Sequence, residues 1–151
     1  MKVITLSLLL SLSAQLYAQK TNPNYDEALA KKLGADDYGM KSYILVILKT
    51  GSNTSEDKEA RQKAFQGHMS NMSSMVEKNQ LIVAGPIEKN EKSYRGIFIL
   101  NANSFDEAKQ ILDSDPAIKA NYLELELYTW YGSAALSQYL EDSDKIWKIG
   151  I

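Results

Sequence analysis

Hydrophobic and polar positions along the chain predict four strands. Residues 43–48 and 96–100 are apolar at every position, and a strand without a polar face is covered on both sides. The run "LIVAGP" at 81–86 predicts a third strand that ends at a Gly-Pro turn. In "YLELELYTWYG" at 122–132, leucines alternate with glutamates and a tyrosine, which predicts a strand with one core face and one polar face.

Two further stretches have helical spacing. The first runs to about residue 78, and we expect it to start at a cap on Thr54 or Ser55 and to end with Asn79 in the left-handed conformation. Its apolar residues recur on one helical face, which we expect to lie on the sheet. This stripe consists of Phe65, Met69, Met72 and Val76. The second stretch, at 105–112, begins with the spacing of a capping box.

The order of these elements is strand, helix, strand, strand, helix, strand, which is the split βαβ arrangement of ferredoxin-like folds. We therefore predict an α+β domain whose four-stranded antiparallel sheet carries both helices on one face. The other face stays apolar at 43–48 and 96–100, and a second copy of the sheet packed against it is the simplest cover. The expected partner is the chain itself, as a homodimer.

The first eighteen residues are not expected to belong to this domain. Lys2 precedes an apolar run at 3–12, and small residues lead to a cleavage site after Ala18. This pattern is typical of a secretory signal peptide and predicts export to the periplasm or the medium. The apolar run is too short to span a bilayer.

The rest of the chain divides into three parts by the same patterns. An extension with a short helix occupies 19–40, the main domain occupies 41–132, and a helical tail occupies 133–151.

Composition narrows the classes of partner and cofactor. With 17 basic and 19 acidic residues, the chain has a mild negative charge, which argues against nucleic acid or an anionic membrane as partner. There is no cysteine and only one histidine, so one subunit cannot form a usual zinc site, and we expect no metal. No glycine-rich phosphate loop or dinucleotide motif is present, and we expect no cofactor.

Two residues stand out as candidates for chemistry. The single histidine, His68, lies roughly 80° from the centre of the apolar stripe, at the border between core and solvent, where it can face a cleft. The alternative is a structural ring that packs against the sheet. Asp115 precedes Pro116, as expected for an N-cap followed by proline at the first helical position. A capping carboxylate is fixed in space, so it can also orient an imidazole.

Five other residues are weaker candidates for binding a substrate. Gly85 and Pro86 end a strand where a turn or a close backbone approach is expected. Glu124 lies on the polar face of the last strand, where it is either solvated or a second acid or base. Trp130 either walls a pocket or packs in a dimer. Arg95, at a strand entrance, fits a solvated surface charge better than an anion anchor.

Several motifs together resemble the YCII-related family. They are "HM" at 68–69, "LIVAGP", "GIFIL", "FDEAKQIL" and "DSDPAIKA", and the flanks "AKKLGADDYGMK" and "WYGSAAL" further resemble an exported bacterial branch. The resemblance implies a dimeric α+β barrel with a His–Asp pair in a cleft of each subunit, which maps here onto His68 and Asp115. One relative removes chloride from a chlorinated hydroxyquinol, so the resemblance implies a scaffold suited to acid–base elimination or isomerisation.

The leading hypothesis is a small acid–base enzyme of lyase or isomerase type that acts on a small polar ring or carbonyl compound. His68 would be the general base, Asp115 would hold its tautomer and stabilise the imidazolium, and a backbone N–H near Gly85 would contact an oxyanion. The alternative is a binding or scaffolding homodimer whose cleft holds a ligand without turnover. A histidine that titrates near neutrality favours the enzyme.

Overall fold

The computed structural model describes residues 22–149, so the predicted signal peptide at 1–18 lies outside the described residues. Four strands form one antiparallel sheet in the order β2-β3-β1-β4. Their bounds are Met40–Thr50 for β1, Leu81–Pro86 for β2, Tyr94–Leu100 for β3 and Leu123–Ser133 for β4. The predicted α+β fold with a ferredoxin-like strand order is confirmed.

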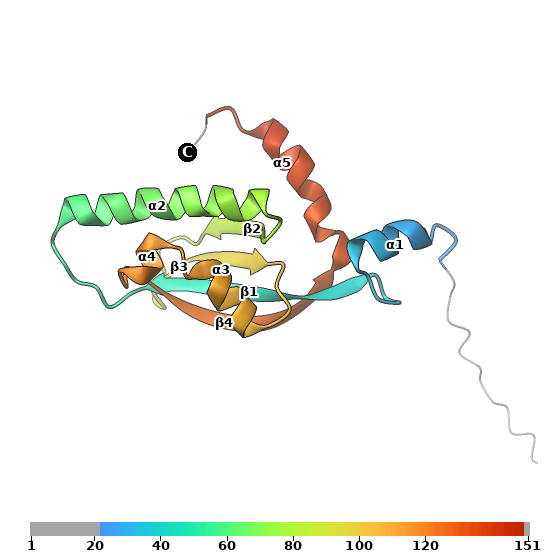
Figure 1. Cartoon of the computed structure of the whole chain (residues 1–151), viewed down its shortest axis with the longest axis horizontal. Helices are drawn as coiled ribbons and strands as arrows, with labels where there is room; N and C mark the ends of the chain where they lie inside the picture. The colour runs from blue at the N-terminus through green and yellow to red at the C-terminus, as the bar shows by residue number, and fades with distance from the viewer. Residues whose placement is uncertain (1–21, 150–151) are drawn as a thin grey trace, which may run out of the picture.

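Helices cover one face of this sheet (Figure 1). The long helix α2 spans Lys58–Glu77, and α3 (Phe105–Leu112) and the short α4 (Pro116–Lys119) lie beside it. Between them and the sheet lies the main core, which is built from aliphatic residues of the strands together with Phe98, Met75 and Leu112. None of the helices within residues 22–149 has the length and apolar character needed to cross a membrane.

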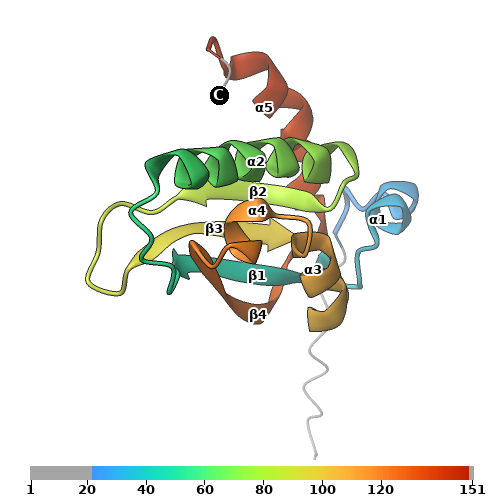
Figure 2. The same cartoon turned by 60° about the vertical axis from the view of Figure 1, so that its left-hand side comes forward.

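Shorter helices flank the two ends of the domain. Helix α1 (Glu27–Leu33) precedes β1, and the 3-10 helix η1 (Ala134–Tyr139) continues from β4 into α5 (Leu140–Ile146). Figure 2 shows α5 rising past one end of α2, away from the sheet.

The N-terminus of α2 differs from the prediction. The N-cap is Asp57, whose carboxylate accepts a hydrogen bond from the N–H of Ala60 at 2.9 Å, and not Thr54 or Ser55. The preceding loop is held by Asn53, whose amide donates to the carbonyl of Ala120 at 2.7 Å. Because the loop is fixed there, the first helical turn begins later along the chain. The predicted left-handed conformation of Asn79 is confirmed, with φ 55°.

The prediction that the apolar stripe of α2 forms the face on the sheet holds only in part: Met72 and Phe65 pack against buried clusters, but the stripe is not the most buried face of the helix. The buried residues of the helix are Ala64, His68 and Met75, whereas Val76 is 40% exposed. The true inner face is rotated from the stripe by about a quarter turn. The reason is His68, which counts as polar in the pattern but lies inside because a carboxylate binds it.

The second sheet face is partly covered within one chain. Tyr43, Ile82 and Ile99 form a buried cluster there, and Leu136 of η1 and Leu140 of α5 pack on it. The expectation that a second copy of the sheet is the simplest cover of this face therefore needs correction, because the C-terminal segment covers one end of it. Apolar and aromatic surface remains at the other end, where the partly buried Leu45 and Ile47 lie beside Tyr128, which is 49% exposed.

Candidate functional site

His68 lies on the inner face of α2, directly above the sheet. Its imidazole stacks on the ring of Phe98 in β3, with centroids 5.8 Å apart and planes 19° from parallel, and the ring of Phe65 meets it edge-on. The residue is only 7% exposed. The predicted border position is thus too far out, since the imidazole forms part of the buried face.

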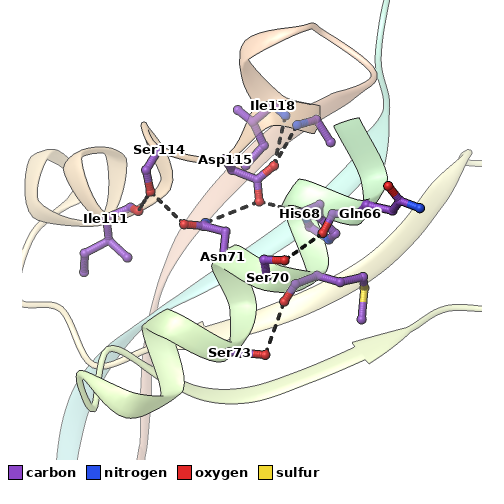
Figure 3. A network of polar contacts seen from close by, with 11 residues as sticks. Gln66, His68, Ser70, Asn71, Ser73, Ile111, Ser114, Asp115 and Ile118 are labelled. Carbon is purple, nitrogen blue, oxygen red and sulfur yellow. Dashed lines mark hydrogen bonds and ion pairs between the residues drawn. The ribbon is translucent and has the colours of Figure 1, made fainter. Parts of the chain in front are cut away.

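The structure brings His68 and Asp115 together (Figure 3). Nδ1 of His68 lies 2.6 Å from Oδ2 of Asp115, which is fully buried. The other carboxylate oxygen accepts hydrogen bonds from the N–H groups of Ala117 at 2.9 Å and Ile118 at 3.2 Å. The predicted N-cap role of Asp115 is confirmed, and the same carboxylate contacts the imidazole with its free oxygen.

Two polar residues that the sequence analysis missed hold this carboxylate in place. The amide nitrogen of Asn71 lies 3.5 Å from Oδ2 of Asp115, and the hydroxyl of Ser114 donates to the amide oxygen of Asn71 at 2.8 Å (Figure 3). The Ser114 bond sets the orientation of the amide so that its NH₂ faces the carboxylate. The available signal was Asn71, a poor helix former placed three residues after the only histidine.

Gly67 makes the close approach of α2 and α4 possible, and the sequence analysis missed it as well. A Cβ atom at this position would lie 2.6 Å from Cγ of Pro116, which is closer than any real contact. Glycine in a helix interior costs about 1 kcal/mol relative to alanine. A glycine next to His68 inside a predicted helix therefore indicated that another segment of the chain packs closely against this position.

The charge state of Asp115 follows from its contacts. Burial alone would raise the pKa of Asp115, but the hydrogen bond and charge of His68 and the N–H groups of Ile118 and Ala117 outweigh it. The pKa of this carboxyl therefore lies below its ordinary value of 3.8, and the group is an anion at neutral pH. A carboxylate only accepts hydrogen bonds, so Nδ1 of His68 carries a proton.

The other imidazole nitrogen is free to act on a ligand. Nε2 of His68 has no hydrogen-bond partner among residues 22–149. Because every fully buried side-chain nitrogen or oxygen in that part of the chain has a partner, Nε2 is not fully buried. With the proton on Nδ1, the lone pair of neutral His68 is on Nε2. The arrangement can therefore accept a proton at Nε2 and stabilise the resulting cation through Asp115.

The sheet beside the His68 ring is not covered by large side chains. Ala84 lies opposite Phe98, and Pro86 lies opposite Gly96, so these four residues point to the helix-covered face. Ala84 and Pro86 are nevertheless exposed, and Gly96 has no side chain. The end of β2 therefore forms an open floor next to the stacked rings, and Pro86 belongs to it.

The remaining predicted residues lie elsewhere. By alternation, Gly85 faces the opposite side of the sheet from Pro86, and no atom lies within 4 Å of its Cβ position. Glu124 and Trp130 are on that opposite face too, where Trp130 packs against Tyr43 with ring centroids 5.6 Å apart. Within one chain, the structure does not bring these residues to the His68 site.

Arg95 is likewise separate from the His68 site. It lines a hollow of about 450 Å³ at the hairpin between β2 and β3, together with Lys89 and Asn90. Within residues 22–149, no group of three His, Asp or Glu side chains is placed to hold a metal ion.

A larger hollow, of about 1140 Å³, lies between α2, strand β2 and the C-terminal segment. The residues of the predicted apolar stripe of α2 line this hollow on one side, and Trp147 and Ile149 of the C-terminal segment line it on the other. Neither His68 nor Asp115 is part of this lining, although Phe65 borders both the hollow and the imidazole.

Comparisons with known proteins found a matching family and similar solved structures. The family model for the YCII-related domain matches residues 43–130. Among solved structures, the chain is similar to the 5-chloro-2-hydroxyhydroquinone dehydrochlorinase of Burkholderia phenoliruptrix AC1100 in complex with 2,5-dihydroxybenzoquinone. The two share 21% identity over 58% of this chain and 92% of that chain, with a TM-score of 0.41. No curated protein matches the chain.

Proposed function

The chain belongs to the YCII-related domain family, and we propose that it is a small acid–base enzyme that moves a proton on a small molecule. The observation that supports this proposal is the imidazole of His68, which has Nδ1 at 2.6 Å from a buried carboxylate and Nε2 free. A general base needs a lone pair that a substrate can reach and a partner that orients the ring. Both are present.

In the proposed reaction, Nε2 of His68 takes a proton from a C–H or O–H group of the substrate. The electron pair left behind moves into the substrate, where it forms a double bond and either expels a leaving group or is reprotonated at another atom. Asp115 stabilises the imidazolium during this step, because its negative charge is already in place at Nδ1. Return of the proton to the leaving group or to a new carbon restores neutral His68.

The surroundings of the pair reduce the motion that the reaction requires. Phe98 holds the plane of the imidazole by stacking, and Asn71 and the α4 N-terminus hold the carboxylate from two sides. Groups that are already oriented lower the barrier because no reorganisation is needed when charge develops. The substrate class that this supports is a small carbonyl compound or polar ring with an acidic proton.

A hydrogen-exchange assay tests the proposal without knowledge of the natural substrate. Small carbonyl compounds are incubated with the protein in D₂O, and loss of their C–H signals is followed by NMR. We expect the wild type to catalyse exchange for at least one compound, His68→Gln to abolish it, and Glu124→Gln to leave it unchanged because Glu124 lies on the other sheet face. Saturable binding without any exchange would instead identify a binding or scaffolding protein.

We also propose that the chain is exported and forms a homodimer. Export is supported by the signal-peptide pattern around Lys2 and Ala18. Dimer formation is supported by the apolar and aromatic surface at Ile47 and Tyr128, which lies outside the cluster on which the C-terminal segment packs.

A further inference from the structure

A positively charged side chain, Arg61, shares an aromatic neighbour, Phe65, with the imidazole of His68. Its guanidinium carbon is 5.9 Å from the ring centre of Phe65 and 5.8 Å from the ring centre of Tyr122. Phe65 in turn contacts the imidazole of His68 edge-on, with centroids 6.1 Å apart. The guanidinium of Arg61 and the imidazole of His68 therefore both contact the ring of Phe65.

The charge of Arg61 is not neutralised by the residues around it. Within residues 22–149, no carboxylate lies within ion-pair distance of its guanidinium, and no hydrogen bond from the guanidinium is present. The acid one helical turn before Arg61, Asp57, uses its carboxylate to cap α2 through the N–H of Ala60. Arg61 is exposed, so its N–H donors are open to a ligand.

Helix geometry places Arg61 on the same side of His68 as the free nitrogen. At about 100° per residue, Asn71 is offset from His68 by about 60° in one direction, and Phe65 and Arg61 are offset by about 60° and 20° in the other. Asp115 contacts Asn71 and Nδ1 of His68, so the carboxylate lies on the Asn71 side. The opposite edge of the imidazole, which carries Nε2, consequently faces the side of Phe65 and Arg61.

We propose that the ligand of the His68 site is a small organic acid whose carboxylate is bound by Arg61. Its carbon skeleton lies against Phe65 and presents the reacting atom to Nε2. This inference rests on the proposed function and names the substrate class of the same site. Arginine suits the role because its planar guanidinium binds a carboxylate with two parallel hydrogen bonds.

Two features of the molecule favour a fixed anion anchor at this point. The chain carries a net negative charge of −2, so an acidic ligand gains no general attraction from the protein as a whole. The cation–π contacts of Arg61 with the rings of Phe65 and Tyr122 limit the motion of its side chain before a ligand binds. The arginine side chain therefore loses less conformational entropy on binding.

The test compares benzoate with benzamide, which share a ring and differ in charge. Binding is measured from the ring-proton shifts of His68, the single histidine of the chain. We expect benzoate at millimolar concentration to shift these signals saturably and benzamide to bind at least about fivefold more weakly. Arg61→Gln should weaken benzoate binding by about five- to tenfold, as expected for loss of a charge-assisted contact.

The control is Lys63→Gln, which removes the same charge from an exposed position on the far side of α2 and should leave benzoate binding unchanged. Equal binding of the two probes, an unchanged affinity in Arg61→Gln, or no shift with either probe would overturn the inference. None of these outcomes changes the exchange assay with His68→Gln, which tests the proposed function separately.

Discussion

Replacing Gly67 with alanine tests whether the close packing of α2 on α4 holds the His68–Asp115 pair. On an exposed helix face, this change would stabilise the protein by about 1 kcal/mol. Here the new methyl group would lie 2.6 Å from Cγ of Pro116, whose ring cannot swing away. Restoring an ordinary carbon–carbon contact requires α4 to move back by about 1 Å.

That movement has a direct consequence for the pair. Asp115 is the N-cap of α4, so it moves with the helix, and its 2.6 Å contact with Nδ1 would lengthen to about 3.5 Å, where a hydrogen bond is no longer effective. Loss of a hydrogen bond to a charged group costs about 1.5–3 kcal/mol, which exceeds the gain from helix propensity. We expect Gly67→Ala to lower the free energy of unfolding by about 0.5–2 kcal/mol.

Urea unfolding measures this loss, and a proton NMR titration of His68 shows whether the pair is disturbed. The matched control is Pro116→Ala, alone and combined with Gly67→Ala, because removal of Cγ gives the new methyl group room. The double variant should recover part of the stability and of the wild-type titration, a positive coupling in a double-mutant cycle. If Gly67→Ala is about 1 kcal/mol more stable than the wild type and titrates identically, the packing argument is refuted.

Four further predictions follow: two from the site, one from the sheet and one from the N-terminus. Asp115→Asn should keep α4, because Asn caps a helix as well as Asp, but it removes the carboxylate that lies 2.6 Å from Nδ1, so the ring-proton NMR signals of His68 should shift. Unchanged ring signals would show that the two residues are not partners. Because the pKa of Asp115 is lowered on folding, its stabilisation is complete above about pH 4 and is lost as the pH falls through the lower folded value, so Asp115→Asn should flatten the acid limb of a stability–pH curve. Light scattering should give a dimer mass at micromolar concentration, and a monomer mass would contradict the homodimer. Mass spectrometry of the protein from its native envelope should show a chain that starts near Gln19, and an intact Met1 would exclude cleavage.

The succession of strands and helices along the chain and the caps of α3 and α4 could be read from the sequence, because each depends on short-range patterns. Runs without a polar residue indicated the two central strands, and the alternation of leucine with glutamate indicated the edge strand β4. The N-cap of α4 could also be predicted, because Asp115 followed by Pro116 is a typical N-cap with proline at the first helical position. The pairing of Asp115 with His68 came from family resemblance and not from spacing.

Tertiary structure alone decided which side of α2 faces the sheet. A hydrophobic pattern places polar residues outside, but His68 lies inside because Asp115, 47 positions away in sequence, satisfies its Nδ1. The contributions of Asn71 and Gly67 depend on the same approach of α4, which no local pattern encodes. Coverage of Tyr43 by the C-terminal segment is also a long-range contact, so the sequence showed an apolar face without showing what covers it.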